Sequence, residues 1–599
     1  MARILSMILV MCLCMPLLPA RRNTAVAQDD ARERTVLTIG DWCDRSANRY
    51  DGKDQLGIWQ YLEDQLGVEI RYVHLSEGQY ETALASGELP DIVATNNDLS
   101  GILAAGAAMD VEPYLEEYVP NFLTGSPRLS YDVIKLLTPS EGGFYFFPSK
   151  IGYNGIGFSN TFNTRGYCVR WDYYKELGCP PINNEDDYLD VLVRMQANHP
   201  YTEEGWPTYL YGTDNLQGYD TAFRTELSLD YWAAYQYHNN IFTNEIYDGY
   251  VDIDHSIWWA AMAWQHRLYL AGRDNSTYDM ELFTQSQEEF YTKCRRGQYM
   301  GLHNGTEMLY EAKSADEPDT LSGYCTVPTA ATNWYANVYQ LLGNGSQYMW
   351  FISANSPNRE VALKLFNLMY DPTFVRECAV GKRGVTWDYD DYGVPLMNDY
   401  GIEQMNAFLT GDRSKDNYFY QWGRRETLPN NWPLLHSSMI HPDGYPLDFY
   451  TQNREYAQST MTNNVARDMC EVYGVELPSD AFYEAGGLDF RNDCGEAISS
   501  CITDLNDDQL SVISDADAIL DSALIDLVFA ETNEEFDNIR SVTIQRIIDL
   551  GEPEVFRAYQ QKWDAAADAI VPLVMEAQLE NGIEPYTPQD YEKLPYVKK

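Results

Sequence analysis

The chain has 599 residues and a formal net charge of −48, because 90 Asp and Glu outnumber 42 Lys and Arg. This length exceeds the roughly 250–300 residues that one hydrophobic core can serve, which excludes a single-domain protein. The negative field disfavours nucleic acid and anionic membranes as partners, and an apolar content of 45% excludes a disordered chain.

Residues 1–27 have the pattern of a secretory signal peptide. An apolar run that is too short to span a bilayer stably follows a weakly positive start. Ala25 and Ala27 then supply the small residues that precede a cleavage site, here in front of Gln28. We therefore expect a secreted protein, located at the extracellular cell surface or in a periplasm.

Two features of this segment leave alternatives open. Arg21 and Arg22 interrupt the region before the cleavage site, so a membrane anchor is the other interpretation. Cys12 and Cys14 leave lipid attachment open, although bulky residues precede both. The remaining nine cysteines have irregular spacing without a CxxC pair, so we assign neither a zinc cluster nor a disulfide.

The first part of the mature chain alternates strand and helix patterns. The order predicts a mainly parallel sheet that helices cover. In such sheets the loops after the carboxyl ends of the strands form the binding crevice. The predicted elements are strands at 34–42, 68–75 and 91–94, with helices at 54–66 and 79–86 between them.

The segment "LASGELPDIV", residues 84–93, leads into one of these loops. Gly87 is expected to end a helix in the left-handed conformation, and Pro90 to precede a buried strand. This strand would deliver Asn96 and Asn97 to the rim of the sheet, beside Trp42 and the loop at residues 76–77. An ordinary connection without a ligand is the alternative interpretation.

Later segments continue the alternation of strands and helices. Residues 168–198 read as a strand, a short helix, a proline turn and a longer helix. The strand 348–352 leads to a helix that is expected to start at Ser356 with Pro357 in its first turn. Two helices separated by Gly551 are expected near the C-terminus.

Four stretches, in order along the chain, carry a resemblance to a known family. They are "LASGELPDIV", "GGFYFFPSK" with "VRWDYYKELGCPPINNEDDYLDVL", "ISANSPNREVALKLFNLMYDP" with "GKRGVTWDYDDYGVP", and "FAETNEEFDNIRSVTIQRIIDLGEPEVFRAYQQKWD". The chain resembles the extracellular solute-binding proteins of family 1, the maltose-binding-protein-like receptors of ABC importers, in their long lipoprotein-type branch.

The resemblance implies an α/β protein with the two-lobe fold of type II periplasmic binding proteins. Each lobe would be a mainly parallel sheet flanked by helices, with extra helices at the C-terminus. Lobe 1 would comprise residues 35–167 and 348–400, and lobe 2 residues 168–347 and 401–599. The solute would be held between the lobes.

The resemblance also implies a monomeric, non-catalytic receptor that needs no cofactor and delivers a solute to an ABC permease. An oligosaccharide is the solute that the resemblance implies, since many long members of this family bind oligosaccharides. The aromatic content of 14% agrees, because sugar rings stack on aromatic planes while their hydroxyls need polar partners. Lys150 and Arg170 could pair with an acidic sugar or with carboxylates of their own lobe. The expected ligand contacts are Trp42, Glu77, Asn96, Asn97, Lys150, Arg170 and Trp387.

Alternatives concern metal binding and catalysis. Some uronate-binding relatives carry a calcium loop where this chain reads "HPYTEEGWPTYLYG", which lacks alternating acidic ligands. Residues 388–399 partly match an EF-hand loop, but a β-turn is favoured. No metal site is therefore assigned. A secreted polysaccharide-degrading enzyme and a surface glycan-binding adhesin are the other function classes, although common hydrolase motifs are absent from the sequence.

Overall fold

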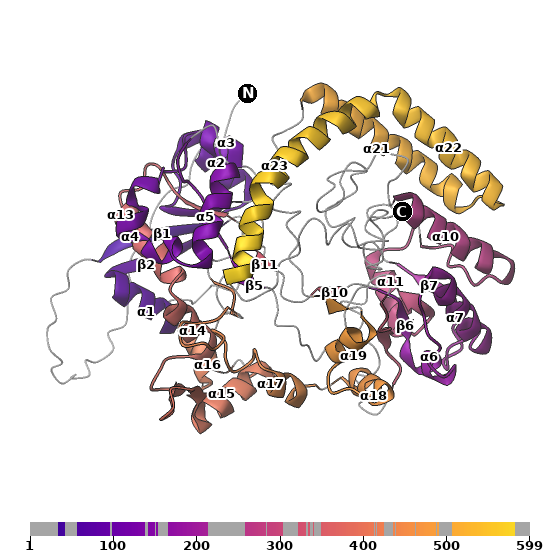
Figure 1. Cartoon of the computed structure of the whole chain (residues 1–599), viewed down its shortest axis with the longest axis horizontal. Coiled ribbons are helices and arrows are strands. Elements are labelled where there is room, and N and C mark those ends of the chain that lie inside the picture. The colour runs from indigo at the N-terminus through magenta and orange to yellow at the C-terminus, as the bar shows by residue number, and fades with distance from the viewer. Residues whose placement is uncertain are drawn as a thin grey trace, which may run out of the picture.

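The computed structural model describes most of the chain and shows two α/β lobes (Figure 1). The described residues are 34–41, 57–95, 99–137, 142–149, 151–153, 166–213, 258–302 without 283, 321–330, 334–335, 339–340, 349–423 without 413 and 415, 435–489 without 438, 462 and 487, and 506–580.

Lobe 1 is built on a five-stranded sheet in the order β2-β1-β3-β12-β4. β1 pairs in parallel with β2 and with β3, whereas β12 runs antiparallel to both β3 and β4. These strands are β1 (Thr35–Asp41), β2 (Val68–His74), β3 (Ile92–Thr95), β4 (Phe147–Pro148) and β12 (Met349–Ile352). The βαβαβ order that the sequence predicts is therefore confirmed.

Lobe 2 is built on a smaller sheet, which has four described strands in the order β7-β8-β6-β9. β7 and β8 are parallel, and β6 runs antiparallel to β8 and to β9. The strands are β6 (Cys168–Arg170), β7 (Tyr209–Gly212), β8 (Tyr299–Leu302) and β9 (Tyr324–Thr326). The pairing directions make β7, β8 and β9 run the same way.

Each sheet contains one described strand that runs against the others, and the reason is topological. β12 is the strand by which the chain returns to lobe 1, and β6 is the strand by which it enters lobe 2. In both cases the chain arrives at the carboxyl edge of the parallel strands. The entering strand must therefore run in the opposite direction, so both sheets are mainly parallel, as predicted.

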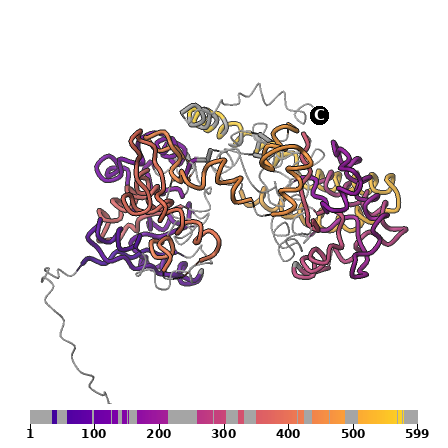
Figure 2. Tube along the Cα trace, turned by 90° about the horizontal axis from the view of Figure 1, so that it is seen from below, coloured from indigo at the N-terminus to yellow at the C-terminus, as the bar shows by residue number. Residues whose placement is uncertain are grey.

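Helices cover both sheets, and the two views separate the lobes in the same way (Figures 1 and 2). Lobe 1 carries α1 (Gly57–Leu66), α2 (Glu77–Ser86), α3 (Leu99–Ala104), α4 (Leu115–Tyr118), α5 (Ser126–Leu137), α13 (Arg359–Met369) and α14 (Pro372–Val380). Lobe 2 carries α6 (Trp171–Glu176), α7 (Glu185–Asn198), α10 (Trp258–Gly272), α11 (Gln287–Arg295), α18 (Asn464–Tyr473), α19 (Pro478–Ala485), α21 (Asp507–Val528) and α22 (Asn533–Asp549). Among the described residues, no helix combines the length and apolar content of a membrane span.

Smaller elements complete the fold. A hairpin and two helices follow α14, namely β13 (Trp387–Tyr389), β14 (Pro395–Met397), α15 (Asp399–Leu409) and α16 (Tyr418–Trp422), and α17 (Arg454–Ser459) lies further along. Between the lobes are two short ribbons (Figure 1). They pair β5 (Gly152–Tyr153) with β11 (Tyr339–Gln340), and β10 (Trp334–Tyr335) with β15 (Leu488–Asp489). The last described helix is α23 (Glu552–Glu580).

Two large hydrophobic clusters form the cores of the lobes, and their members bear on the predicted borders. The sequence assigns all of residues 401–599 to lobe 2. In the structure, however, Trp422, Leu435 and Leu447 belong to the first cluster, as do Ala566 and Ile570. Residues 465–555 contribute to the second cluster, as predicted for lobe 2. The exact borders between the lobes stay a prediction, and the packing favours a lobe 1 that includes residues 401–447.

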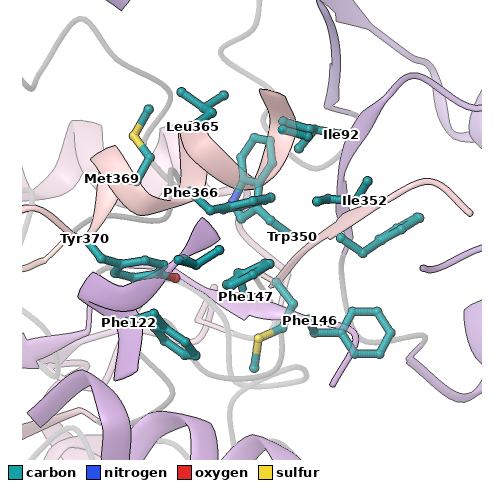
Figure 3. Packing of buried hydrophobic residues seen from close by; sticks show 14 of the residues in the cluster. Ile92, Phe122, Phe146, Phe147, Trp350, Ile352, Leu365, Phe366, Met369 and Tyr370 are labelled. Atoms are coloured by element: carbon teal, nitrogen blue, oxygen red, sulfur yellow. The ribbon is translucent and has the colours of Figure 1, made fainter. Parts of the chain in front are cut away.

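A group of aromatic rings lies within the core of lobe 1 (Figure 3). Phe147 of β4 stacks on Phe366 of α13 at 4.1 Å between ring centroids. Phe122 lies against Tyr370, whose phenolic hydroxyl donates to the carbonyl of Pro148 at 2.5 Å. These contacts fasten α13 to the edge strand, and aromatic pairs of this kind stabilise a core beyond the area they bury.

Asp91 connects three distant segments of lobe 1. Its carboxylate accepts hydrogen bonds from the backbone N–H and hydroxyl of Thr38, both at 2.8 Å. It also accepts from the hydroxyl of Ser356 at 2.6 Å and from the side-chain amide of Asn358 at 3.2 Å. The side chain of Asn358 reaches the carbonyl of Val36 as well. This carboxylate therefore fixes β1, β3 and the segment that follows β12.

The caps explain where several helices begin and end. Ser76 starts α2 with a capping box, and Gly87 ends it at φ 72°, which confirms the predicted left-handed cap. The predicted start of α13 at Ser356 is wrong, because the helix begins at Arg359 with Asn358 as its cap. The hydroxyl of Ser356 donates to Asp91 and accepts from the backbone N–H of Asn358, so it lies before the helix and does not accept from its first turn.

Asp91 gives the first testable prediction. Hydrogen bonds to a charged group contribute about 1.5–3 kcal/mol each, so Asp91→Ala is expected to lower the free energy of unfolding of lobe 1 by about 3–5 kcal/mol. Urea unfolding, followed by tryptophan fluorescence, measures the loss. Asp64→Ala is the matched control, because Asp64 is 67% exposed and makes a surface ion pair with Arg34. Equal losses in the two variants would contradict this role.

Candidate functional site

The carboxyl edge of the lobe 1 sheet brings together chain positions that are far apart in sequence. β1 ends at Asp41, which pairs with His74 at the end of β2. β3 ends at Thr95, which pairs with Met349 at the start of β12, and Met349 in turn pairs with Pro148 of β4. All five strands therefore begin or end on one line, which we call the lobe 1 edge.

The lobe 2 sheet has a corresponding edge. Gly212 at the end of β7 pairs with Leu302 at the end of β8. Leu302 pairs with Cys168 at the start of β6, and Cys168 also pairs with Thr326 at the end of β9. These four positions form the lobe 2 edge, which is again the carboxyl edge of the strands that share a direction.

The chain passes between the lobes only at these two edges within residues 142–352, as far as the structure describes them. It leaves lobe 1 after Pro148 and enters lobe 2 at Cys168, and it leaves lobe 2 after Thr326 and returns at Met349. β5 and β11, which belong to these two connections, pair with each other between the lobes (Figure 1). The candidate site is the region where the two edges are joined, since ligands of open α/β sheets bind outside the carboxyl ends of the strands.

Two polar side chains lie on the lobe 1 edge. Asp41 is buried and accepts a hydrogen bond from the hydroxyl of Tyr72 at 2.6 Å. Thr95 is also fully buried, and its hydroxyl has no hydrogen-bond partner among the described residues. Because burying an unpaired hydroxyl costs free energy, Thr95 is a candidate ligand contact. The sequence signal is a hydroxyl residue at the end of the apolar strand "IVAT", directly before Asn96.

Five of the predicted contacts cannot be assessed from their side chains. Trp42, Asn96, Asn97 and Lys150 lie outside the described residues, and of Glu77 the structure describes only its place as the first residue of α2. Asp41 and Thr95, which directly precede Trp42 and Asn96, end strands on the lobe 1 edge. The assignment of these five residues to the ligand stays a prediction.

Arg170 lies away from the lobe 2 edge, at the far end of β6. Its guanidinium binds both carboxylate oxygens of Asp172, at 2.9 and 3.0 Å, and donates to the carbonyl of Gly297 at 2.7 Å. It also stacks on the ring of Tyr173. These contacts match the alternative in which Arg170 pairs with a carboxylate of its own lobe. A role of Arg170 as a ligand contact stays a prediction, which these contacts do not favour.

Trp387 is buried in a small cluster after α14. Its indole N–H donates to the carbonyl of Gly381 at 2.8 Å, and its ring packs against Tyr389 and Phe449. The guanidinium of the fully buried Arg376 lies 5.6 Å from the ring centre. A ligand role for Trp387 stays a prediction, while the described contacts make it a core residue of this cluster.

A buried ion pair holds the same cluster together. The guanidinium of Arg376 binds both oxygens of Asp443 and also the carbonyls of Tyr445 and Pro446. Burial alone would raise the pKa of Asp443, but hydrogen bonds from Arg376 and Tyr389 hold that pKa well below its ordinary value. His441, at 3.1 Å from Asp443, has a lowered pKa because of its burial and the nearby Arg376.

The partial EF-hand pattern at 388–399 forms the hairpin of β13 and β14. The carboxylate of Asp390 accepts from the backbone N–H groups of Tyr392 and Val394, and Asp388 pairs with Arg383. These acidic side chains are used within the hairpin, in agreement with the favoured β-turn.

Exposed tryptophans would offer ring surfaces on which a sugar can stack. Trp258 and Trp259 are both buried in α10. Of the tryptophans whose side chains the structure describes, only Trp206 is more than a third exposed. Trp206 lies before β7 and under the guanidinium of Arg296, at the end of the sheet opposite to the lobe 2 edge.

Comparison with known proteins identifies the family. The profile described as "Bacterial extracellular solute-binding protein" matches residues 46–374, which is more than half of the chain. The chain belongs to this family. A solute-binding protein of this family is extracellular in the broad sense, that is, secreted or periplasmic. A search of curated proteins finds no match to the chain.

Solved structures of such solute-binding proteins share the fold at low sequence identity. One is an HMO-binding, ABC-transporter-associated solute-binding protein from Bifidobacterium longum infantis, with 13% identity, a TM-score of 0.54 and coverage of 89% of this chain and 99% of that chain. Another, from Bifidobacterium longum subsp. infantis, has 14% identity, a TM-score of 0.53 and coverage of 90% and 99%. A third is an EF-hand mutant of the S. pneumoniae substrate-binding protein FusA in complex with fructo-nystose. It has 15% identity, a TM-score of 0.52 and coverage of 89% of this chain and 100% of that chain.

These solved relatives are similar to the whole length of the two-lobe body, which supports the two-lobe α/β fold of this solute-binding protein. The family and these neighbours are binding proteins. The fold alone does not decide which solute binds here.

His441 and Asp443 predict a pH dependence of stability. The pKa of His441 is lowered in the folded state, so its contribution is present above the unfolded value of about 6.5 and is lost as the pH falls below it. The pKa of Asp443 is also lowered, so its contribution is lost only below about pH 4. Between pH 7.5 and 5.5, stability is therefore expected to fall, with a slope of at most about 1.4 kcal/mol per pH unit from His441.

His441→Gln is expected to remove that part of the slope, whereas Asp443→Asn changes the dependence below pH 4. Thermal unfolding at half-unit pH intervals measures both effects. An identical slope for wild type and His441→Gln between pH 7.5 and 5.5 would show that His441 does not titrate as proposed.

Proposed function

We propose that this solute-binding protein captures an oligosaccharide between its lobes by hinge closure and delivers it to the permease of an ABC importer. The observation that carries the proposal is the joining of two carboxyl sheet edges by the two interlobe connections within residues 142–352. A solute at this place can contact both sheets at once. The family membership supports solute binding, and the choice of an oligosaccharide is our proposal.

Two similar solved structures support the oligosaccharide class. One relative is described as HMO-binding, and FusA is described in complex with fructo-nystose. The net charge of −48 favours a neutral sugar over an anionic one, since the field of the protein repels anions. The lobe 1 edge also supplies polar groups suited to sugar hydroxyls, namely the carboxylate of Asp41 and the hydroxyl of Thr95.

The proposed mechanism is a shift between open and closed arrangements of the lobes. A solute that contacts both edges in the closed arrangement, but only one in the open arrangement, binds the closed state more tightly. It stabilises closure by that difference in affinity, and no covalent step is needed. A hinge must lie in the connections between the lobes. β5 belongs to one of these connections and β11 to the other, and the two strands pair with each other.

The partners and location follow from this proposal. The closed, loaded protein is proposed to act as a monomer that docks on the transmembrane subunits of the permease. Residues 1–27 are proposed to direct export, and tethering through that region would keep the receptor near the permease. Both points concern residues and partners outside the described part of the chain.

A ligand screen by thermal unfolding tests the proposed function. A solute present at one hundred times its Kd is expected to stabilise the protein by about 2.7 kcal/mol, which raises the unfolding temperature by several degrees. The panel contains neutral fructo-oligosaccharides, milk oligosaccharides, uronate oligomers, monosaccharides and peptides. We expect shifts only with neutral oligosaccharides, and titration calorimetry then measures the Kd.

Two outcomes would contradict the proposal. Stabilisation by peptides alone would make a peptide, and not an oligosaccharide, the solute. Unfolding temperatures that do not change with any compound of the panel would refute the capture of a soluble sugar. The release of reducing ends from polysaccharides by the purified protein would favour the enzyme alternative. Binding to insoluble glycan without any soluble ligand would favour the adhesin.

Thr95→Val tests the lobe 1 edge directly. The variant keeps the shape of the side chain but removes its buried hydroxyl, so the free protein should be as stable as wild type or more stable. If the hydroxyl bonds to the sugar, the Kd is expected to rise about threefold to tenfold, which corresponds to about 0.5–1.5 kcal/mol.

Ser130→Ala is the matched control for this variant. Ser130 of α5 is also fully buried, and its hydroxyl has no partner among the described residues either, but α5 lies outside the lobe 1 edge. Its variant should leave the Kd unchanged. A Kd that is unaffected by Thr95→Val would remove this hydroxyl from the site.

A further inference from the structure

Helix α23 is the one described element that belongs to the cores of both lobes. It is a helix of 29 residues, Glu552–Glu580, with Pro572 inside it. Because an interior proline kinks a helix, the stiff part is the stretch of 20 residues before Pro572, which is about 30 Å long at 1.5 Å per residue. Figure 1 shows it running from α21 and α22 in lobe 2 to the region of β5, β11 and α5 in lobe 1. A helix of this length is stiff on the scale of one lobe.

The first turns of α23 are fastened to lobe 2. Val555 is buried in the second hydrophobic cluster, and Phe556 packs against the same cluster. Glu552, at the start of the helix, is buried as well. α21 and α22 both lie against α23, so its orientation at this end follows from lobe 2.

The later turns of α23 are fastened to lobe 1. Ile570 is fully buried in the first cluster, together with Ala566 one turn before it. Leu573 packs against the same cluster. Along this part α23 lies against α5, and Glu576 forms an ion pair with Arg128 of α5 at 3.3 Å.

Tyr559 lies at the junction between these two attachments. It packs against the first cluster and also against the second. Its burial raises the pKa of its phenol to about 12. α23 also contacts β11, the strand that pairs with β5 between the lobes. The helix is therefore attached to lobe 2, to lobe 1 and to the ribbon of β5 and β11.

We propose that α23 is a strut that sets the distance between the lobe 1 edge and the lobe 2 edge, and that Val555, Tyr559 and Ile570 are positioning residues for ligand binding. A ribbon of two short strands leaves the lobes free to twist and to separate. A stiff helix buried in both cores limits these motions to those that keep both attachments. The strut thereby keeps the edges at a spacing that a solute can bridge.

The part of this proposal that concerns affinity rests on the proposed function. If loosening the strut spreads the lobes over many spacings, the fraction of molecules ready to bind falls, and the apparent Kd rises by the same factor. We expect at least a fivefold rise in Kd for an attachment variant, although no substituted residue lies on either edge.

The experiment measures the interlobe distance without any ligand. A spin-labelled amino acid is introduced at position 73 in β2 and at position 193 in α7, because both valines are exposed, one in each lobe. Electron–electron resonance then gives the distance distribution for the full-length protein. Ile570→Ala and Val555→Ala are each expected to broaden this distribution.

Matched controls separate the strut from general loss of packing. Ile102→Ala removes an equally buried isoleucine from the core of lobe 1, and Val191→Ala removes an equally buried valine from that of lobe 2. Both controls lower stability without touching α23, so their distance distributions should match that of wild type. Equal broadening in controls and attachment variants would overturn the proposal.

The double variant gives a further signature. Once one end of a strut is free, releasing the other end adds nothing, so Val555→Ala combined with Ile570→Ala should broaden the distribution no more than the stronger single variant. Additive broadening would contradict a strut. Unchanged distance distributions in both single variants would refute the strut. Failure of the wild-type protein to bind any sugar would refute only the proposed ligand, and the distance result would remain valid.

Discussion

The carboxylate of Asp91 is the contact on which the arrangement of lobe 1 depends. It is almost fully buried, and it is bonded by Thr38 of β1 and by Ser356 and Asn358 beyond β12. A buried charge is tolerated only when its hydrogen bonds are made, so the returning chain must come back to this place. β12 is thereby held beside β3, and the line of strand ends from Asp41 to Pro148 exists because that reversed strand is in register.

Much of this framework can be predicted from local pattern. Alternation and helical spacing in residues 35–95 suffice for the strands and helices there, because their apolar faces repeat with the periods that a covered sheet requires. The start of α13 could not be predicted locally. Ser356 followed by Pro357 is a normal helix start, but the side chain of Ser356 is oriented by its hydrogen bond to Asp91, which is 265 residues away in sequence. A local rule cannot include a partner so distant in sequence.

In the candidate site, too, the positions of residues could be predicted from the sequence, whereas their surroundings could not. The two edges follow from the order of the strands. The position of Asp41 and of Thr95 at strand ends on the lobe 1 edge could therefore be predicted from the sequence. The surroundings of Arg170 and Trp387 could not, because their partners come from other segments, Gly297 for the guanidinium and Phe449 for the indole. An arginine or a tryptophan near a predicted strand end suits a sugar site and a core equally well. Thr95 attracts attention only when its hydroxyl is known to be buried without a described partner.

The shared helix has a consequence for biosynthesis. Val555 completes the core of lobe 2 and Ile570 that of lobe 1, so neither core can close until the ribosome has translated these last turns of the chain. Until residues 349–352 emerge, the nascent chain also lacks the partner that β3 acquires from β12. An unpaired strand edge and unfinished apolar cores are the features that invite aggregation during synthesis. This fold therefore exposes such features over most of its translation, in contrast to chains whose domains mature one after another.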